Sequence, residues 1–214
     1  MKIIPQQVKI LAAPSTPCEL LEIAARTCTN SVDSSKGDAF DFVRRVIMAR
    51  KHYSVLEHVS ITFELTTSRA IANQIVRHRM AAYCQESMRY VKLNRKDGGL
   101  HVIKPYGYDE WEPIAQCQWE CTMDDCETSY TRLLQYGVKP EQARGVLPLD
   151  TATVLVATWN LRELFHILYH PVSGRLTNTH AQPQTRQLFQ LLENALEDQL
   201  PTIYKLAKLY EENA

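Results

Sequence analysis

The chain has 214 residues, with 24 lysines and arginines against 24 aspartates and glutamates, 45% hydrophobic residues and 7 glycines. A chain of this length buries well over half of the surface that it exposes when unfolded, so it folds without disulfides or metals. Its formal net charge of zero excludes the basic field of a general nucleic-acid binder or a polybasic membrane protein.

The N-terminal residues lack the basic, apolar and small-residue regions of a leader peptide, and no run of 18 apolar residues occurs. We therefore predict a cytoplasmic protein that binds neither membranes nor nucleic acid. Six cysteines are scattered at positions 18, 28, 84, 117, 121 and 126, and we expect free, mostly buried thiols. The CxxC pairs of structural zinc sites are missing, so we predict no metal.

The first sixty residues predict one strand and two helices. Residues 8–11 favour the strand, and Pro17 suits the first turn of the first helix. A second helix is expected over residues 39–50, because four apolar residues are spaced for one face. These are Phe40, Val43, Val46 and Ile47.

The middle of the chain predicts a strand, a helix and a second short strand. Apolar residues alternate with polar ones over residues 59–63, as in a half-buried strand. A helical pattern covers residues 68 to about 79 and would place Arg79 on its apolar face if the helix continued, so either the helix ends there or Arg79 has a partner. A polar connection over residues 92–99 leads to a strand at residues 101–103.

The second half of the chain is mostly helical. A long helix is expected over residues 109–136, with a buried stripe marked by Trp119, Cys126 and Leu133. Residues 151–159 are rich in β-branched side chains and predict a strand. Asn160 and Glu163 follow as the N-cap and third residue of a capping box, and the last 35 or so residues are expected to be helical.

These elements lack the repeating βαβ order of a doubly wound fold. They predict an α+β fold, with a mixed or antiparallel sheet packed by helices and long helices in the second half. Nothing marks a linker, so we expect a single domain over residues 1–214. The sequence contains neither GxGxxG nor GxxxxGK[ST].

Residues 77–89 place three arginines, a histidine and a serine within a short segment of a neutral protein. A solvated basic face is one interpretation. The apolar face before the segment favours another, in which the core holds it in place. Arginine side chains presented from a fixed backbone bind phosphate oxygens in a bidentate manner, and a hydroxyl completes such a site. We predict an anion site here.

Arg77-His78-Arg79, followed after seven residues by Ser87, resembles the hallmark motif of the flavin-dependent thymidylate synthases. The resemblance extends over about residues 8–190, in the family's order and nearly its spacing. The further matching positions are Ala24-Ala25-Arg26, His52, Glu57-His58, Gln74, Arg89, Arg144 before Leu147-Pro148-Leu149, Asn160, Arg162, and Arg175 before His180-Ala181-Gln182.

This resemblance implies an α+β homotetramer whose active sites are shared between subunits and hold FAD. No histidine or cysteine stands in a recognisable flavinylation context, so we expect the FAD to be noncovalent. The implied reaction is reductive methylation of a pyrimidine nucleotide at C5, most simply dUMP to dTMP. Methylenetetrahydrofolate would give the carbon, and NADPH would reduce the flavin. Within the same chemistry, UMP as substrate or a hydroxymethyl product remains open. A non-catalytic nucleotide-binding module and a structural helical protein are alternatives from other classes.

The resemblance implies roles for individual residues. The residues implied around the nucleotide are Gln74, Arg77, Gln85, Glu86, Ser87, Arg89, Arg144 and Arg175. Those implied against FAD are His52, Ser54, Glu57, His78, Arg79, Asn160, Arg162, His166 and His180. Each has a plainer alternative: Asn160 as a helix cap, Glu57 as a surface carboxylate, and His52 or His58 as a core imidazole.

Arg175 and Ser87 form the implied catalytic set. Arg175 would be the donor on the base, where it stabilises charge that develops as the ring is activated. Its alternative is a surface arginine in a Ser-Gly-Arg loop. No general base stands at a spacing that would activate Ser87, so we interpret it as a hydrogen-bond ligand of the nucleotide, not as a nucleophile. Cys84 lacks the Pro-Cys-His setting of classical thymidylate synthases, and we interpret it as a packing residue.

The chain departs from the family pattern around the nucleotide. Ala82 stands where a serine is usual, and Cys84-Gln85 replace an Asn-Glu pair, with Glu86 one step later. Pro183-Gln184 occupy the place of a usual glutamate, and the stretch from Arg175 to His180 is one residue longer. Fewer polar partners at the nucleotide predict weaker discrimination between dUMP and UMP.

Overall fold

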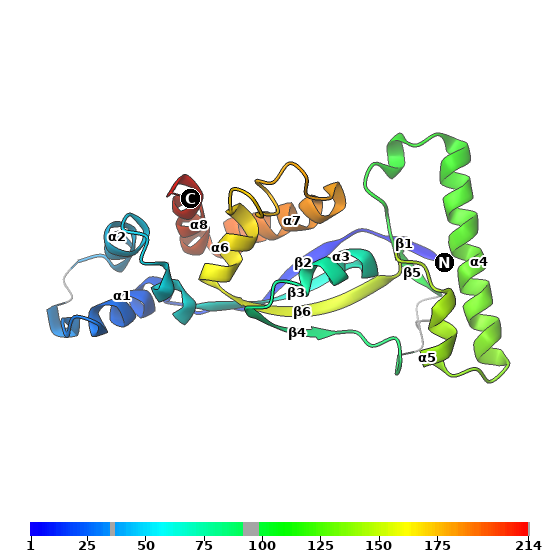
Figure 1. Ribbon diagram of the computed structural model, residues 1–214, viewed down its shortest axis with the longest axis horizontal. Helices are drawn as coiled ribbons and strands as arrows, with labels where there is room; N and C mark the ends of the chain where they lie inside the picture. The colour runs from blue at the N-terminus through cyan, green and yellow to red at the C-terminus, as the bar shows by residue number, and fades with distance from the viewer. Residues whose placement is uncertain (35–36, 92–98, 214) are drawn as a thin grey trace. The chain divides into compact units, whose positions relative to one another are not determined.

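The structure is a computed structural model that describes residues 1–34, 37–91 and 99–213. Helices and sheets are mixed along the chain, which confirms the expected α+β class (Figure 1). The polar connection predicted over residues 92–99 lies, apart from Gly99, outside the described residues. Within the described part of the chain, no helix has both the length and the apolar character needed to cross a bilayer.

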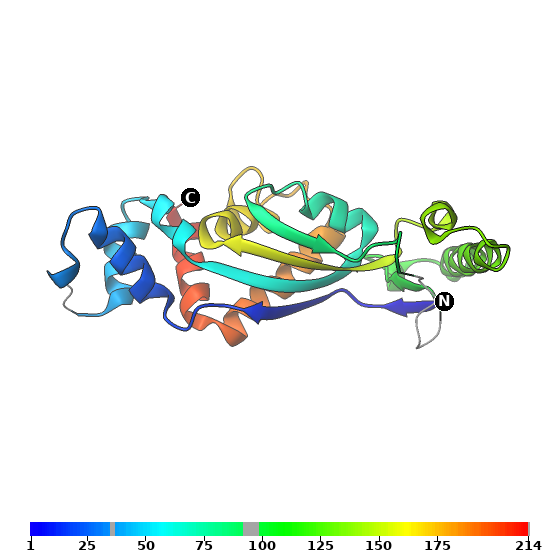
Figure 2. The same cartoon turned by 90° about the horizontal axis from the view of Figure 1, so that it is seen from below.

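The larger sheet has four strands in the order β2-β3-β6-β4, each antiparallel to its neighbours (Figure 2). Their bounds are Gln7–Ala12, Ser60–Ser68, Ala152–Asn160 and Ala81–Gln85, respectively. A smaller sheet pairs β1 (Lys2–Ile4) with β5 (His101–Ile103) in parallel. The strands predicted at residues 8–11, 59–63, 101–103 and 151–159 are confirmed, whereas β1 and β4 had not been predicted.

Eight α-helices are described: α1 Pro17–Thr27, α2 Ala39–Phe42, α3 Arg69–Ile75, α4 Pro113–Gln135, α5 Pro140–Ala143, α6 Leu161–Tyr169, α7 Pro183–Gln199 and α8 Pro201–Asn213. A π-helical segment, Val43–Met48, continues α2 and completes the helix predicted over residues 39–50. Short 3-10 turns cover Val32–Ser34, Tyr53–His58, Tyr108–Glu110 and Arg144–Val146.

Three predicted helix boundaries were wrong, and proline explains two of them. The helix expected from residue 109 begins at Pro113, because proline disfavours helical backbone at the residue before it. The helical C-terminal region divides at Pro201, which opens α8. Helix α3 ends at Ile75, so Arg79 lies beyond the helix, exposed to solvent.

The cysteines are free, as expected, but the prediction that most are buried was wrong. Only Cys18 is buried, while Cys28, Cys84, Cys117 and Cys121 are exposed. On α4 the buried positions are Met123 and Tyr130, with the expected Trp119, Cys126 and Leu133 only partly buried. The two exposed α4 cysteines are one helical turn apart, with their sulfurs separated by 3.8 Å.

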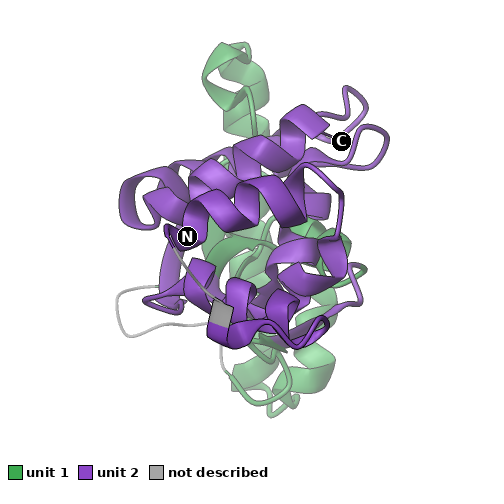
Figure 3. Cartoon of the chain, turned by 90° about the vertical axis from the view of Figure 1, so that its left-hand side faces the viewer, with its two compact units in different colours: residues 1–7, 65–77, 84–155 green, residues 8–64, 78–83, 156–214 purple. Residues whose placement is uncertain are grey.

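The described residues group into two compact units (Figure 3). Unit 1 contains residues 1–7, 65–77 and 84–155, and unit 2 contains residues 8–64, 78–83 and 156–214. Boundaries fall inside β2, β3, β4 and β6, so one strand can carry residues of both units. A single domain over residues 1–214 stays a prediction.

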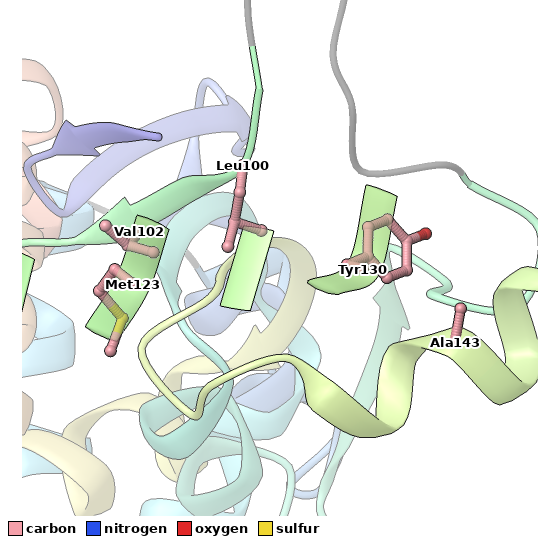
Figure 4. Packing of buried hydrophobic residues seen from close by; sticks show 5 residues of the cluster. All are labelled: Leu100, Val102, Met123, Tyr130 and Ala143. Carbon is pink, nitrogen blue, oxygen red and sulfur yellow. The ribbon is translucent and has the colours of Figure 1, made fainter. Parts of the chain in front are cut away.

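Unit 1 has its own apolar core (Figure 4). It comprises Leu100, Val102, Met123, Tyr130 and Ala143, with Trp119 and Leu133 among the partly buried residues packed against it. The indole N–H of Trp119 donates to Asp150 at 3.1 Å, so the ring contributes both apolar surface and a satisfied polar group. This core holds α4 against β5.

Unit 2 is centred on an aromatic cluster. The Trp159 ring lies 5.5 Å from Phe63 and 6.4 Å from Phe189, measured between centroids, and all three side chains are fully buried. Helix α6 adds Leu164, Phe165 and Leu168 to the buried surface. Such aromatic contacts stabilise beyond the area that they bury.

We expect Phe63→Ala to lower the free energy of unfolding by about 3–5 kcal/mol, because it leaves a cavity beside Trp159. Urea unfolding monitored by tryptophan fluorescence measures the loss. Val172→Ala is the control: the Val172 side chain is 76% exposed, and its truncation should change stability by less than about 0.5 kcal/mol. Equal midpoints for the two variants would contradict the assigned core.

Candidate active site

Unit 2 contains a cavity of about 410 Å³. Its lining comes from the Tyr53–His58 turn, the residue before β4, the start of α6 and helix α8. The lining residues are Tyr53, Glu57, Met80, Asn160, Arg162, Glu163, His166 and Tyr210. Four of these, Glu57, Asn160, Arg162 and His166, had been implied to contact FAD, so the structure brings them together.

Asn160 fixes the start of α6 at the cavity. Its side-chain oxygen accepts a hydrogen bond from the Glu163 backbone N–H at 2.9 Å, which confirms the predicted N-cap. Residues three and four apart share a helix face, so Arg162 and Glu163 both lie near His166. The helix thereby presents a cation, a carboxylate and an imidazole at one wall of the cavity.

Arg162 and Glu57 form an ion pair across the cavity rim, with Nη1 and Oε1 2.6 Å apart. Both side chains are about half exposed, at 53% and 41%, so the pair adds little to stability. Glu57 is therefore not an isolated surface carboxylate. The pair leaves the rim with balanced charge.

His78 is joined to Arg175 within unit 2. The Nε and Nη2 atoms of Arg175 lie 3.3 and 3.0 Å from His78 Nε2. A guanidinium only donates, so Nε2 accepts, and the proton of the neutral imidazole is assigned to Nδ1. That atom is 3.6 Å from a carboxylate oxygen of Glu163. The half-buried Arg175 is thus not the solvated loop arginine of the alternative interpretation.

The surroundings of His78 favour its neutral form. Burial, the positive charge of Arg175 and the proximity of His166 lower the pKa of His78 to about 4. Burial raises the pKa of Glu163, and nearby Arg162 partly opposes this. An uncharged imidazole can keep accepting from Arg175 at neutral pH.

The backbone at His78 is anchored to the aromatic core. The Tyr83 hydroxyl donates to the His78 carbonyl at 2.8 Å, and the Trp159 indole N–H donates to that hydroxyl at 3.0 Å. Trp159 is fully buried, so this chain of hydrogen bonds starts from a rigid residue. Helix α3 ends before His78, and these contacts hold the segment after it.

His166 of the cavity lining contacts a second histidine and a serine. The His166 and His170 rings are 4.4 Å apart between centroids, and Ser173 Oγ lies 2.9 Å from His170 Nδ1. The same hydroxyl is 3.4 Å from His166 Nε2. Burial, His170 and Arg162 together lower the pKa of His166.

Except for Arg175, the residues implied around the nucleotide belong to unit 1. The Ser87 hydroxyl accepts from the Arg89 backbone N–H at 3.2 Å, and Arg89 Nε lies 3.5 Å from a carboxylate oxygen of Glu141. The Gln85 amide lies 3.4 Å from Thr153 Oγ1. Gln74, Glu86 and Arg144 are partly buried, whereas Arg77 is exposed.

Some residues lie apart from the cavity. His52, Ser54, Arg79 and His180 are exposed and do not line it. The alternative of a core imidazole at His52 or His58 was wrong, since both are exposed, and exposed Cys84 is not a packing residue. Among residues 1–34, 37–91 and 99–213, no three His, Cys, Asp or Glu side chains are placed to hold a metal.

Sequence reasoning missed other residues of the cavity. Tyr53 stands between His52 and Ser54, which are both implied FAD residues, and this position could have indicated it. Met80 directly follows Arg77-His78-Arg79. Tyr210 lies in α8, beyond the resemblance, and nothing in its neighbourhood marks it. Tyr83 was missed because its role is to hold a backbone carbonyl, which leaves no pattern.

Comparison with known proteins places the chain in a family. The family model described as "Thymidylate synthase complementing protein" matches residues 9–202. The flavin-dependent thymidylate synthase of Geobacter sulfurreducens is 35% identical over 207 residues, covering 93% of this chain and 85% of that protein. The one from Thermococcus kodakarensis is 36% identical over 166 residues, covering 76% and 65%.

The fold is also shared with solved structures. The UMP/dUMP methylase PolB of Streptomyces cacaoi bound with 5-Br dUMP has a TM-score of 0.78 at 21% identity, covering 99% of this chain and 98% of that one. With 5-Br UMP bound, the TM-score is 0.76 at 23% identity, with the same coverage. The motif residues, the fold and the similarity over most of the chain agree, and the chain belongs to the flavin-dependent thymidylate synthase family.

Proposed function

We propose that the protein methylates C5 of dUMP to give dTMP, with methylenetetrahydrofolate as carbon donor, FAD as cofactor and NADPH as reductant. The observation that carries the proposal is the hydrogen bond between His78 and Arg175. It links the Arg77-His78-Arg79 motif to Arg175, the donor implied at the pyrimidine base. The proposal further includes a cytoplasmic homotetramer with shared sites. Closed symmetry is the usual route to sites of this kind.

The unit 2 cavity suits part of a flavin. Its volume falls within the range of about 300–1,000 Å³ that is typical of ligand pockets. Tyr53, Tyr210 and Met80 offer flat or adaptable apolar surface, while Arg162 and His166 offer donors. His52, Ser54, Arg79 and His180 would complete the FAD site from outside the cavity. Bound FAD would supply the hydride that reduces the transferred carbon.

Arg175 would act on the pyrimidine. Uracil C5 is a weak nucleophile, and a donor fixed at a ring carbonyl stabilises the charge that develops during its attack. His78 holds the Arg175 guanidinium through two donor atoms, so the donor is oriented before substrate binds. Ser87, Arg77, Arg89 and Arg144 would bind the nucleotide, with the arginines on its phosphate.

UMP is a second candidate substrate. Ala82 and Cys84 are exposed on β4 and offer no strong acceptor, while the Gln85 amide is already engaged by Thr153. The PolB relative is described as acting on both UMP and dUMP. A site with few polar partners for the sugar discriminates weakly against an added hydroxyl.

We expect dUMP to be preferred over UMP by less than about 10³-fold in kcat/KM, which corresponds to about 4 kcal/mol. The values of kcat/KM for dUMP and for UMP are measured at identical folate, FAD and NADPH concentrations, and the products are identified by mass spectrometry. A greater preference would contradict the weakly discriminating site. A colourless protein that cannot be reconstituted with FAD would instead favour the nucleotide-binding module.

Arg175→Ala should lower kcat by about 10²- to 10³-fold, because it removes a donor to developing charge. Flavin affinity should stay within about threefold, or about 0.6 kcal/mol. Arg77→Ala should mainly raise KM for the nucleotide, and exposed Arg45→Ala is the control. Steady-state kinetics and flavin titration separate these effects. Equally small effects of Arg175→Ala and Arg77→Ala on kcat and KM would contradict the roles assigned to these two residues.

His78 should make stability depend on pH. Its pKa is about 4 when folded, against about 6.5 in the unfolded chain, so the unfolded chain binds more protons between these values. The free energy of unfolding should therefore fall by at most about 3 kcal/mol as pH drops from 6.5 to 4. Urea unfolding at several pH values gives the free energy of unfolding as a function of pH. The dependence on pH should be weaker in His78→Gln than in wild type, and unchanged in the exposed control His58→Gln. The same slope in both would exclude His78 as the source.

A further inference from the structure

We propose that Arg69 is a positioning residue of the nucleotide site: its guanidinium holds the Glu86 carbonyl and so fixes the turn that carries Ser87 and Arg89. All these residues belong to unit 1. The inference rests on the proposed function, because it takes Ser87 and Arg89 as ligands of the nucleotide. Arg69 itself lies outside the Arg77-His78-Arg79 motif and is the first residue of α3.

The backbone of Arg69 is fixed on both sides. Its N–H donates to the Thr151 carbonyl at 3.0 Å, which ties the start of α3 to the start of β6. The preceding Ser68 is buried and caps α3, accepting from the Ile71 N–H at 3.3 Å. The long Arg69 side chain therefore leaves from a rigid point.

The guanidinium meets the chain immediately before Ser87. Arg69 Nη2 donates to the Glu86 carbonyl at 2.7 Å, while the Glu86 N–H donates to the Val154 carbonyl at 2.9 Å. Both backbone groups of Glu86 are thus held. Beyond it, two local hydrogen bonds shape the turn: Val91 N–H donates to the Ser87 carbonyl at 3.1 Å, and Arg89 N–H donates to Ser87 Oγ at 3.2 Å. The Arg89 side chain also pairs with Glu141 at 3.5 Å, but both side chains are largely exposed.

This arrangement is unfavourable for a residue with only a structural role. Arg69 Nε is buried and finds no hydrogen-bond partner among the described residues. Burial lowers the pKa of Arg69, nearby Glu86 raises it, and the positive charge of Arg144 lowers it. Arg69 thus lies near both the Glu86 carboxylate and the Arg144 guanidinium. Two neighbouring guanidiniums suit the phosphate of a bound nucleotide.

The experiment compares Arg69→Met and Arg69→Lys with the wild-type holoenzyme. Arg69→Met should raise KM and Kd for dUMP about 10- to 100-fold, the size expected for a lost hydrogen bond to a charged group. We expect kcat to change much less and bound flavin to be retained. Lysine keeps one charged donor for the Glu86 carbonyl, so Arg69→Lys should recover part of the affinity for dUMP. Arg132→Met, at an exposed position, is the matched control, and its KM and Kd for dUMP should equal those of the wild type.

Hydrogen exchange supplies a readout that needs no nucleotide. Without ligand, the Arg89 and Val91 amides should exchange faster in Arg69→Met than in wild type, and those of α4 should not. Unchanged dUMP affinity, or a lower urea midpoint with normal KM and exchange, would overturn the inference. If Arg69→Met fails to fold, Arg69→Lys with weakened dUMP binding still supports it. A wild-type holoenzyme that neither binds nor methylates dUMP would overturn the proposed function itself.

Discussion

The arrangement of the candidate site depends on one partly buried, uncharged imidazole, that of His78. His78 accepts from Arg175 because its Nε2 carries no proton, and burial beside a guanidinium keeps it so. Protonation would replace this bond with repulsion between two cations. The hydrogen bonds from Trp159 through Tyr83 hold the His78 backbone, and thus connect the aromatic core to the chemistry proposed for the base.

Much of the fold follows from local patterns in the sequence. Alternating residues predicted β3, and the Asn160 cap located the start of α6 within one residue. Strand β4 could not be found in this way, because Ala82 and Cys84 are exposed and supply no alternating apolar face. Its conformation depends on pairing with β6, a contact between distant parts of the chain.

The candidate site was predicted less completely, for a related reason. Motif order indicated Glu57, Arg162 and Arg175, since their chemistry matches a family pattern. It could not show that Glu57 pairs with Arg162, or that Arg175 contacts His78, because these partners are separated by about a hundred residues. Tyr210 and Tyr83 act through shape and through a backbone carbonyl, and neither leaves a sequence pattern.

The division of the chain into units has a consequence for how the protein folds. Each unit is assembled from three separate stretches of sequence, and the chain passes between units inside β2, β3, β4 and β6. Neither unit can therefore be completed by one contiguous nascent segment, and contacts between residues that lie far apart in sequence slow folding. Residues 156–214 belong to unit 2 together with residues 8–64, so residues 8–64 must await the synthesis of residues 156–214 before that unit is complete.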